Sequence, residues 1–139
     1  MATFHQQLSE LLGVRATEKD SGLLDLIEQR LPTSAIARLL ALGITRPEID
    51  AVVVPLRTLQ HRRSRREKLT IDESDRVLRL ARVLSQTENL YGSRERALSW
   101  LRTPTPRLGG RAPLSLLNTE AGSRLVEELL VQIDEGMFV

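Results

Sequence analysis

Apolar residues recur at intervals of three and four along most of the 139-residue chain, a spacing that places them on one face of an α-helix. In the first clear segment, residues 21–31, four leucine or isoleucine positions share such a face: Leu23, Leu24, Ile27 and Leu31. Ser21 is a suitable N-cap, and Pro32 interrupts the helical pattern. The next helical segment ends at Gly43, in the position that commonly follows a helix.

Two short helices joined by a tight turn are predicted next. Thr45 and Glu48, three residues apart, form a capping box that opens the first helix. Pro55 ends it, because proline disfavours helical geometry in the residue before it. In the second helix Leu56 and Leu59 face inward, while the other side chains are polar and mostly basic. This order of elements is the helix-turn-helix pattern, whose second helix enters the major groove of DNA.

Three more helices are predicted after this pair, each with its own start signal. Thr70 and Glu73 form another capping box, which precedes a long apolar stripe. Ser93 caps the next helix, which carries Trp100 at the edge of its apolar face. Thr119 caps the last helix, whose inward face has five apolar positions: Leu125, Val126, Leu129, Leu130 and Ile133. Since no strand pattern is present in the sequence, we predict an all-α chain.

The composition excludes several kinds of site. The chain has no cysteine, so it holds neither disulfides nor thiolate metal sites, which fits a reducing cytoplasm. Its two histidines, His5 and His61, lie in unlike contexts, and we expect no metal site between them. No apolar run approaches the roughly 20 residues of a membrane span, and the chain does not open with a signal-peptide pattern. We expect a cytoplasmic protein with no membrane segment and no cofactor.

The sequence offers no catalytic constellation. The pair Gly109-Gly110 is not followed by the Lys-Ser or Lys-Thr of a phosphate-binding loop, and no predicted strand precedes it. Adjacent acids such as Asp72 and Glu73 project about 100° apart on a helix, so they do not share a site. We therefore expect no enzyme. The two glycines and the flanking prolines instead predict a tight turn before the last helix.

Charge is distributed unevenly, although the net charge is only +2. Residues 57–68 carry six basic residues and one acid, whereas residues 112–139 carry five acids and one arginine. A basic middle and an acidic end suit two different partners. A general preference for arginine contributes to the pattern, because eighteen of the twenty basic residues are arginine.

The basic second helix of the helix-turn-helix pattern is the candidate DNA-binding element. Arginine pairs with guanine, glutamine with adenine, and further arginines reach phosphates. The residues that we expect to contact DNA lie on its outward face or just after it: Arg57, Thr58, Gln60, His61, Arg62, Arg63 and Arg65. The alternative interpretation of the same run is a solvated basic linker between two lobes.

A dense set of spaced motifs follows in residues 95–139. The pattern reads A-x-x-W-L, a proline, L-G-G, P-x-x-L-L, T-x-x-G, V-x-x-L-L and a late glycine. It is carried here by Ala97, Trp100, Leu101, Pro104, Leu108, Gly109, Gly110, Pro113, Leu116, Leu117, Thr119, Gly122, Val126, Leu129, Leu130 and Gly136. This block resembles the toxin-binding domain of the Xre/MbcA/ParS antitoxins. The upstream segment, including "RTLQHRR" and "LTIDESDRVLRLARV", is similar to the Xre-like helix-turn-helix of the same family.

The resemblance implies a type II antitoxin made of two domains. Residues 1–80 would hold an N-terminal segment and the helix-turn-helix, and residues 81–139 the toxin-binding domain. The implied partners are a cognate RES-domain toxin, which degrades NAD or transfers ADP-ribose from it, operator DNA, and a second copy in a homodimer. Such a protein represses its own operon and blocks the active site of the toxin, and it performs no reaction itself.

The resemblance and the charge pattern together select the candidate residues of the second domain. The pocket of an NAD-binding toxin is expected to be positively charged with an apolar slot, which acids and an apolar tail would match. The expected toxin-binding residues are Arg107, Arg111, Glu127, Glu128, Asp134, Glu135, Met137, Phe138 and Val139. Structural roles are expected for Trp100, Gly109, Gly110, Pro113, Gly122 and Gly136.

Two other functions remain open at this point. The chain could be a stand-alone helix-turn-helix transcriptional regulator with no toxin, or a dimeric interaction protein that does not bind DNA. A gel shift with the DNA upstream of the gene, and the identity of the neighbouring gene, would separate the three.

Overall fold

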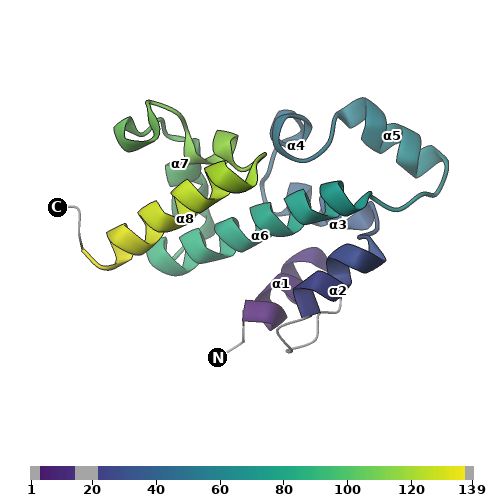
Figure 1. Ribbon diagram of the computed structural model, residues 1–139, viewed down its shortest axis with the longest axis horizontal. Coiled ribbons are helices and arrows are strands. Elements are labelled where there is room, and N and C mark those ends of the chain that lie inside the picture. Colours follow the sequence, from purple (N-terminus) through teal and green to yellow (C-terminus); the bar gives the residue numbers. More distant parts are fainter. Residues whose placement is uncertain (1–3, 15–21, 137–139) are drawn as a thin grey trace. The chain divides into compact units, whose positions relative to one another are not determined.

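A computed structural model of the chain describes residues 4–14 and 22–136. Within those residues the regular elements are eight α-helices and two short 3-10 helices, with no strand (Figure 1). One isolated antiparallel bridge joins Thr105 and Arg111. The all-α fold class that the apolar spacing indicates is therefore confirmed. Among the helices so described, none is both long and apolar enough to span a bilayer.

The chain divides into two compact units, residues 1–81 and residues 82–139, which we call the N-terminal unit and the C-terminal unit. The helices that lie wholly in the N-terminal unit are α1 (Phe4–Leu12), α2 (Gly22–Gln29), α3 (Ser34–Ala41), α4 (Arg46–Val52) and α5 (Leu56–Ser64). Helix α6 (Ile71–Tyr91) begins in the N-terminal unit and ends in the other. The C-terminal unit also holds α7 (Arg94–Arg102), the 3-10 helices η1 (Pro106–Leu108) and η2 (Pro113–Leu116), and α8 (Glu120–Asp134).

Helix α1 lies in a segment to which the sequence assigns no element. It packs on α3, and its Leu8 and Leu12 are fully buried. The Arg38 Nη2 of α3 donates a hydrogen bond of 2.9 Å to the Glu10 carbonyl oxygen near the end of α1. The last carbonyl groups of a helix lack an intrahelical donor, and this bond supplies one. The first helix is thus part of the core of the N-terminal unit.

Among the side chains of α2 that the structure describes, which do not include Leu23, the predicted apolar face is wrong at one position. Leu24 is 61% exposed, whereas Leu26 is buried. The helix also ends at Gln29, because Arg30 adopts the left-handed conformation with φ 64°. Leu31 is buried as expected, but it lies outside the helix, and its backbone N–H donates to Ser74 Oγ at 2.9 Å. The expected N-cap, Ser21, lies outside the described residues.

Helix α8 contacts η2 so closely that only glycine fits at one position of the contact. A Cβ built on Gly122 would overlap the backbone carbonyl oxygen of Leu116. Gly122 is also the donor of the bond from its N–H to Thr119 Oγ1, at 3.0 Å, which confirms the predicted cap of α8. The predicted inward face of α8 is wrong at Leu125, which is 53% exposed.

Candidate functional site

The helix-turn-helix is formed by α4 and α5, which meet at a tight turn and cross steeply (Figure 1). The capping box of Thr45 and Glu48 is present in both directions, with Thr45 N–H donating to Glu48 Oε1 at 2.9 Å. The Leu56 backbone N–H donates to Asp50 Oδ1 at 2.9 Å, which ties the first residue of α5 to α4. The turn is thus held by local bonds, and it fixes the point from which α5 projects.

The outward face of α5 is polar and basic. Arg57, Gln60, His61 and Arg63 are exposed, and Thr58 is half-buried. Arg57, Thr58, Gln60 and His61 line a shallow hollow of about 470 Å³ together with Ser64. The side chains that the sequence selects as base-reading candidates are therefore adjacent on one surface. We call the exposed set, with Arg65, the basic face of α5.

Arg62 differs from the other arginines of α5. Its Nε donates to Glu73 Oε1 at 2.7 Å and its Nη2 donates to Glu73 Oε2 at 3.0 Å, so the two groups form a bidentate pair. Its Nη1 is also 3.5 Å from Glu67 Oε2. The Arg62 side chain is only 18% exposed. A contact between Arg62 and DNA stays a prediction, but the side chain already has two carboxylate partners within the unit.

Glu73 is a buried carboxylate, with 5% of the residue exposed. Burial raises its pKa, but the hydrogen bonds from Arg62 and from Thr70 outweigh it, so the pKa lies below its ordinary value. The hydrogen bond to Glu73 correspondingly raises the pKa of Arg62. Glu73 also accepts from the Thr70 N–H at 2.8 Å, while its own N–H donates to Thr70 Oγ1 at 3.1 Å. The predicted capping box of α6 is confirmed, and the same carboxylate holds α5.

A further candidate, which the sequence analysis does not select, is Arg46 at the start of α4. Arg46 lines a hollow of about 330 Å³ with Gln60 and Arg63 of α5 and two leucines. The first helix of a helix-turn-helix crosses the DNA backbone, so a basic side chain there suits a phosphate. The position of Arg46 immediately after the cap residue Thr45 is the signal that could have found it.

Other arginines of the N-terminal unit are used within the fold. Arg30 Nε donates to the Leu69 carbonyl oxygen at 2.7 Å, and Arg76 Nε donates to the Val53 carbonyl oxygen at 2.7 Å. Arg38 bonds α1, as described above. These guanidinium groups join segments distant in sequence, which the charge pattern alone does not reveal. The arginines of the N-terminal unit are therefore of two kinds: Arg30, Arg38 and Arg76 bond distant segments within the fold, and others form the basic face of α5.

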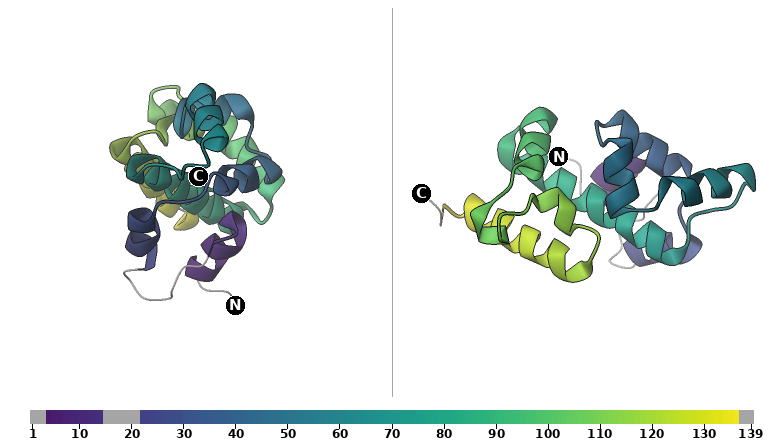
Figure 2. Two further views of the ribbon diagram at one scale, coloured as in Figure 1. Left: turned by 90° about the vertical axis from the view of Figure 1, so that its right-hand side faces the viewer. Right: turned by 90° about the horizontal axis from the view of Figure 1, so that it is seen from above.

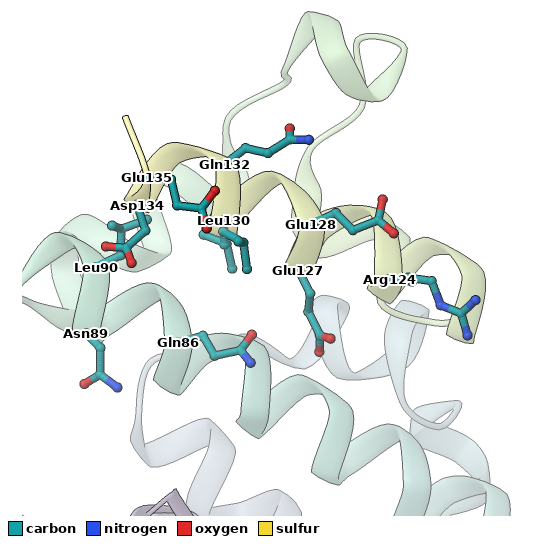
Figure 3. Close-up of a pocket in the computed structure, with 11 residues that line it drawn as sticks. Gln86, Asn89, Leu90, Arg124, Glu127, Glu128, Leu130, Gln132, Asp134 and Glu135 are labelled. Carbon is teal, nitrogen blue, oxygen red and sulfur yellow. The ribbon is translucent and has the colours of Figure 1, made fainter. Parts of the chain in front are cut away.

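The acids of α8 border a hollow of about 720 Å³ between α8 and the second half of α6, within the C-terminal unit (Figure 3). Its apolar lining comes from Leu90, Leu130 and the half-exposed Val131. All four predicted acids of α8 line it as well: Glu127, Glu128, Asp134 and Glu135. The structure thus brings these four predicted residues to one surface, which we call the acidic groove.

The acids of this groove are not equivalent. Glu127 points towards α6, and its Oε1 accepts from Arg82 Nε at 2.7 Å, which fastens α8 to α6 (Figure 3). Glu128, Asp134 and Glu135 are exposed. The charge available to a partner therefore comes mainly from these three, with Arg124 at one end of the groove.

The loop with the glycine pair lies between α7 and α8 and carries exposed Arg107 and Arg111. Neither arginine lines the acidic groove. Gly109 and Gly110 have φ 69° and 77°, and their N–H groups donate to the carbonyl oxygens of Pro106 and Thr105 at 3.1 and 3.0 Å. Because those donors are already used, the loop presents no phosphate cradle. It is a tight turn in the green part of the chain, which Figure 2 shows from two further directions.

Two further sets of residues selected from the sequence are the C-terminal tail and Trp100. The expected tail residues Met137, Phe138 and Val139 lie outside the described residues. Trp100 is half-buried, and its ring centroid is 6.0 Å from that of Tyr91, whose pKa is raised by burial.

Among the residues that the structure describes, no group of three or more His, Cys, Asp or Glu is arranged to hold a metal ion.

Comparison with known proteins divides the chain into two matched regions. Residues 22–82 match the family described as the antitoxin Xre-like helix-turn-helix domain. Residues 86–136 match the antitoxin Xre/MbcA/ParS C-terminal toxin-binding domain. The two matches account for α2 through α8, whereas α1 lies before the first of them.

Three curated relatives are similar over longer stretches. An "Antitoxin Xre" of Pseudomonas putida is 33% identical over 133 residues, which is 96% of this chain and 84% of the relative. An "Antitoxin Xre" of Yersinia enterocolitica is 36% identical over 91 residues, 65% of this chain and 62% of the relative. A "Prs ADP-ribosylating antitoxin" of a Sphingobium species is 34% identical over 98 residues, 64% of this chain and 62% of the relative.

Proposed function

Because the chain belongs to the Xre antitoxin family, we propose that it is a type II antitoxin that neutralises a cognate RES-domain toxin and represses its own operon. The observation that carries this proposal is the placement of two oppositely charged surfaces on separate units, the basic face of α5 and the acidic groove. The chain performs no reaction in this role. It acts from the cytoplasm by binding two partners.

The DNA-binding part of the proposal rests on the basic face of α5. A recognition helix contacts base edges with residues near its N-terminal end, and Arg57, Thr58 and Gln60 occupy the first turns of α5. Arg57 suits guanine and Gln60 suits adenine. Arg63 and Arg65, further along, suit phosphates, as does Arg46 at the start of α4.

The proposed homodimer would place two copies of α5 about one DNA turn apart, roughly 34 Å. The operator should then contain two related half-sites with that spacing. Sedimentation equilibrium of the purified chain measures the dimer directly. A monomer at all concentrations, with or without DNA, would refute this part.

Fluorescence anisotropy with DNA from upstream of the gene tests the DNA-binding part. Affinity should fall steeply with salt, because each neutralised phosphate contributes about 0.9 to the slope of log K against log [salt]. Replacing Arg57 by alanine should weaken binding by about tenfold or more and relax preference at one base pair. The matched control is Arg96→Ala, the same change at an exposed position on α7. Equal losses for both variants, or salt-independent binding, would refute the proposed recognition helix.

The toxin-binding part rests on the acidic groove. An enzyme that binds NAD must accommodate its phosphates, so the surface around its pocket is expected to be positively charged and to attract a negatively charged partner. Glu128, Asp134 and Glu135 supply that charge, and Leu90, Leu130 and Val131 supply apolar contact area beside it. A relative named as an ADP-ribosylating antitoxin supports the choice of a toxin that acts on NAD. The exposed Arg107 and Arg111 would contact the toxin at a separate point.

Charge reversal tests the toxin-binding part. The double variant Glu128→Lys and Glu135→Lys should release a co-expressed RES-domain toxin during affinity purification, because like charges at a rim oppose association. The control is Glu95→Lys, a single charge reversal at an exposed position on α7 outside the groove, to be compared with Glu128→Lys alone as well as with the double variant. If the groove variant retains the toxin as well as the control does, the acidic groove is not the docking surface.

A further inference from the structure

Helix α5 is attached to the N-terminal unit by few apolar contacts. Leu59 is its one buried residue, and Leu56 is half-buried. At its first residue α5 is tied to Asp50 by the bond from the Leu56 N–H. Towards its other end, the bidentate pair between Arg62 and Glu73 joins it to the first turn of α6. The direction in which the basic face points therefore depends on this ion pair.

The chemistry of the pair suits a rigid attachment. The planar guanidinium donates two parallel bonds to one carboxylate, so the relative orientation of the two groups is fixed as well as their distance. Glu73 is itself immobilised, since it is 5% exposed and accepts the Thr70 N–H at 2.8 Å. Arg62 is thereby held against the first turn of α6 and is 18% exposed, whereas Arg57 and Arg63 are exposed.

We infer that Glu73 is a positioning residue for DNA binding, which holds the recognition helix through Arg62 without touching DNA. This inference rests on the proposed DNA-binding function of α5. It assigns Arg62 to the internal attachment of α5 rather than to a phosphate. It also predicts that neutralising Glu73 lowers the affinity for DNA, which is the opposite of what the change in charge alone predicts. Removing a negative charge near a polyanion should raise affinity, whereas losing the attachment should lower it.

The variant Glu73→Gln separates these two effects. Glutamine is accepted at this position of a capping box, so the start of α6 is retained. Its amide offers one acceptor oxygen where the carboxylate offers two, and its NH2 group is a donor that faces the donors of Arg62, so the bidentate pair is lost. The matched control is Asp72→Asn, which removes the same charge from the adjacent, exposed position in the first turn of α6.

Operator affinity is measured by fluorescence anisotropy for the full-length variants, with helix content followed by circular dichroism. We expect Glu73→Gln to bind about tenfold more weakly than wild type, in line with the loss of a buried charge pair. Asp72→Asn should bind as tightly as wild type or more tightly. If Glu73→Gln binds as tightly as Asp72→Asn, the inference is overturned. If wild type does not bind the operator at all, the proposed DNA-binding function fails together with the inference.

A double variant, Arg62→Met with Glu73→Gln, keeps the test decisive if the single variant loses helix content. It leaves no buried charge unpaired, and methionine retains the apolar stem of Arg62. Its affinity should be reduced, while the slope of log K against log [salt] stays at the wild-type value. A slope smaller in magnitude by about 0.9 would mean that Arg62 neutralises a phosphate, and would overturn the inference.

Discussion

Replacing Gly122 by alanine should destabilise the C-terminal unit, although alanine is the better helix former. The added Cβ would overlap the Leu116 carbonyl oxygen and lie 3.0 Å from Thr119 Oγ1, so both η2 and the cap of α8 would have to shift. Overpacking of this kind costs about 1–3 kcal/mol. Contact with backbone rather than with a flexible side chain places the cost near the upper limit.

The gain in helix propensity opposes this loss by about 1 kcal/mol. The net loss is then about 2 kcal/mol, which for a unit of this size lowers the melting temperature by about 8–16 °C. Trp100 is the single tryptophan of the chain and lies in α7, so its fluorescence reports on the C-terminal unit.

The reciprocal change at the exposed neighbour, Ala121→Gly, is the control. It should cost about 0.5–1 kcal/mol through helix propensity alone. Both substitutions should therefore lower the melting temperature, although they exchange the same two residue types in opposite directions. A Gly122→Ala variant that melts at or above the wild-type temperature would show that α8 does not pack on η2 as described.

Three further outcomes are expected. Because the folded-state pKa of Glu73 lies below its ordinary value of 4.5, its contribution to the free energy of unfolding is present above that value. That contribution should be lost as the pH falls through the lower folded-state pKa. Urea denaturation at a series of pH values should therefore show that acid lowers the free energy of unfolding less for Glu73→Gln than for wild type. Equal decreases would contradict the assignment. Gly110→Val should lower the free energy of unfolding by about 1–2 kcal/mol, because φ is 77° there and a β-branched residue is strained in that conformation. A melting curve of Trp100 fluorescence that does not change would count against this prediction. Deleting residues 137–139 should restore toxicity in cells that express both proteins, and full neutralisation by the shortened chain would exclude a plugging tail.

Signals confined to a few neighbouring residues were sufficient to predict several helix starts. Thr45 with Glu48, Thr70 with Glu73, and Thr119 all cap the helices that their spacing indicates. A cap is predictable because the acceptor and the N–H groups that it satisfies lie within three residues of each other. The apolar spacing likewise predicts the all-α class, since the helical period repeats in every long segment.

The errors concern residues at the edges of helix faces. Leu24 and Leu125 fit the apolar spacing of α2 and α8, yet both are more than half exposed. Successive residues differ by about 100° around a helix, so a stripe with adjacent apolar residues, such as Leu23-Leu24 or Leu125-Val126, is compatible with two orientations. Which one is adopted depends on the neighbouring elements, and the sequence does not specify them.

The attachment of α5 lay beyond sequence reasoning for a different reason. Arg62 and Glu73 are 11 positions apart, on two helices joined by an irregular segment in which Arg66 has φ 56°. Composition places Arg62 among the solvent-exposed basic residues, and the capping box accounts for Glu73 without any arginine. Only the path of the chain between the two helices brings the guanidinium to the carboxylate. The same reasoning applies to Arg30 and Arg76, whose carbonyl partners lie 39 and 23 positions away.

Co-expression of the chain with the proposed partner, a cognate RES-domain toxin, tests the central claim most directly, when cellular NAD and the recovery of a complex by size-exclusion chromatography are measured together. The antitoxin function predicts that NAD stays at the level of cells without toxin and that both proteins elute as one complex. NAD depletion or arrested growth despite abundant soluble antitoxin, with the two proteins eluting separately, would contradict it.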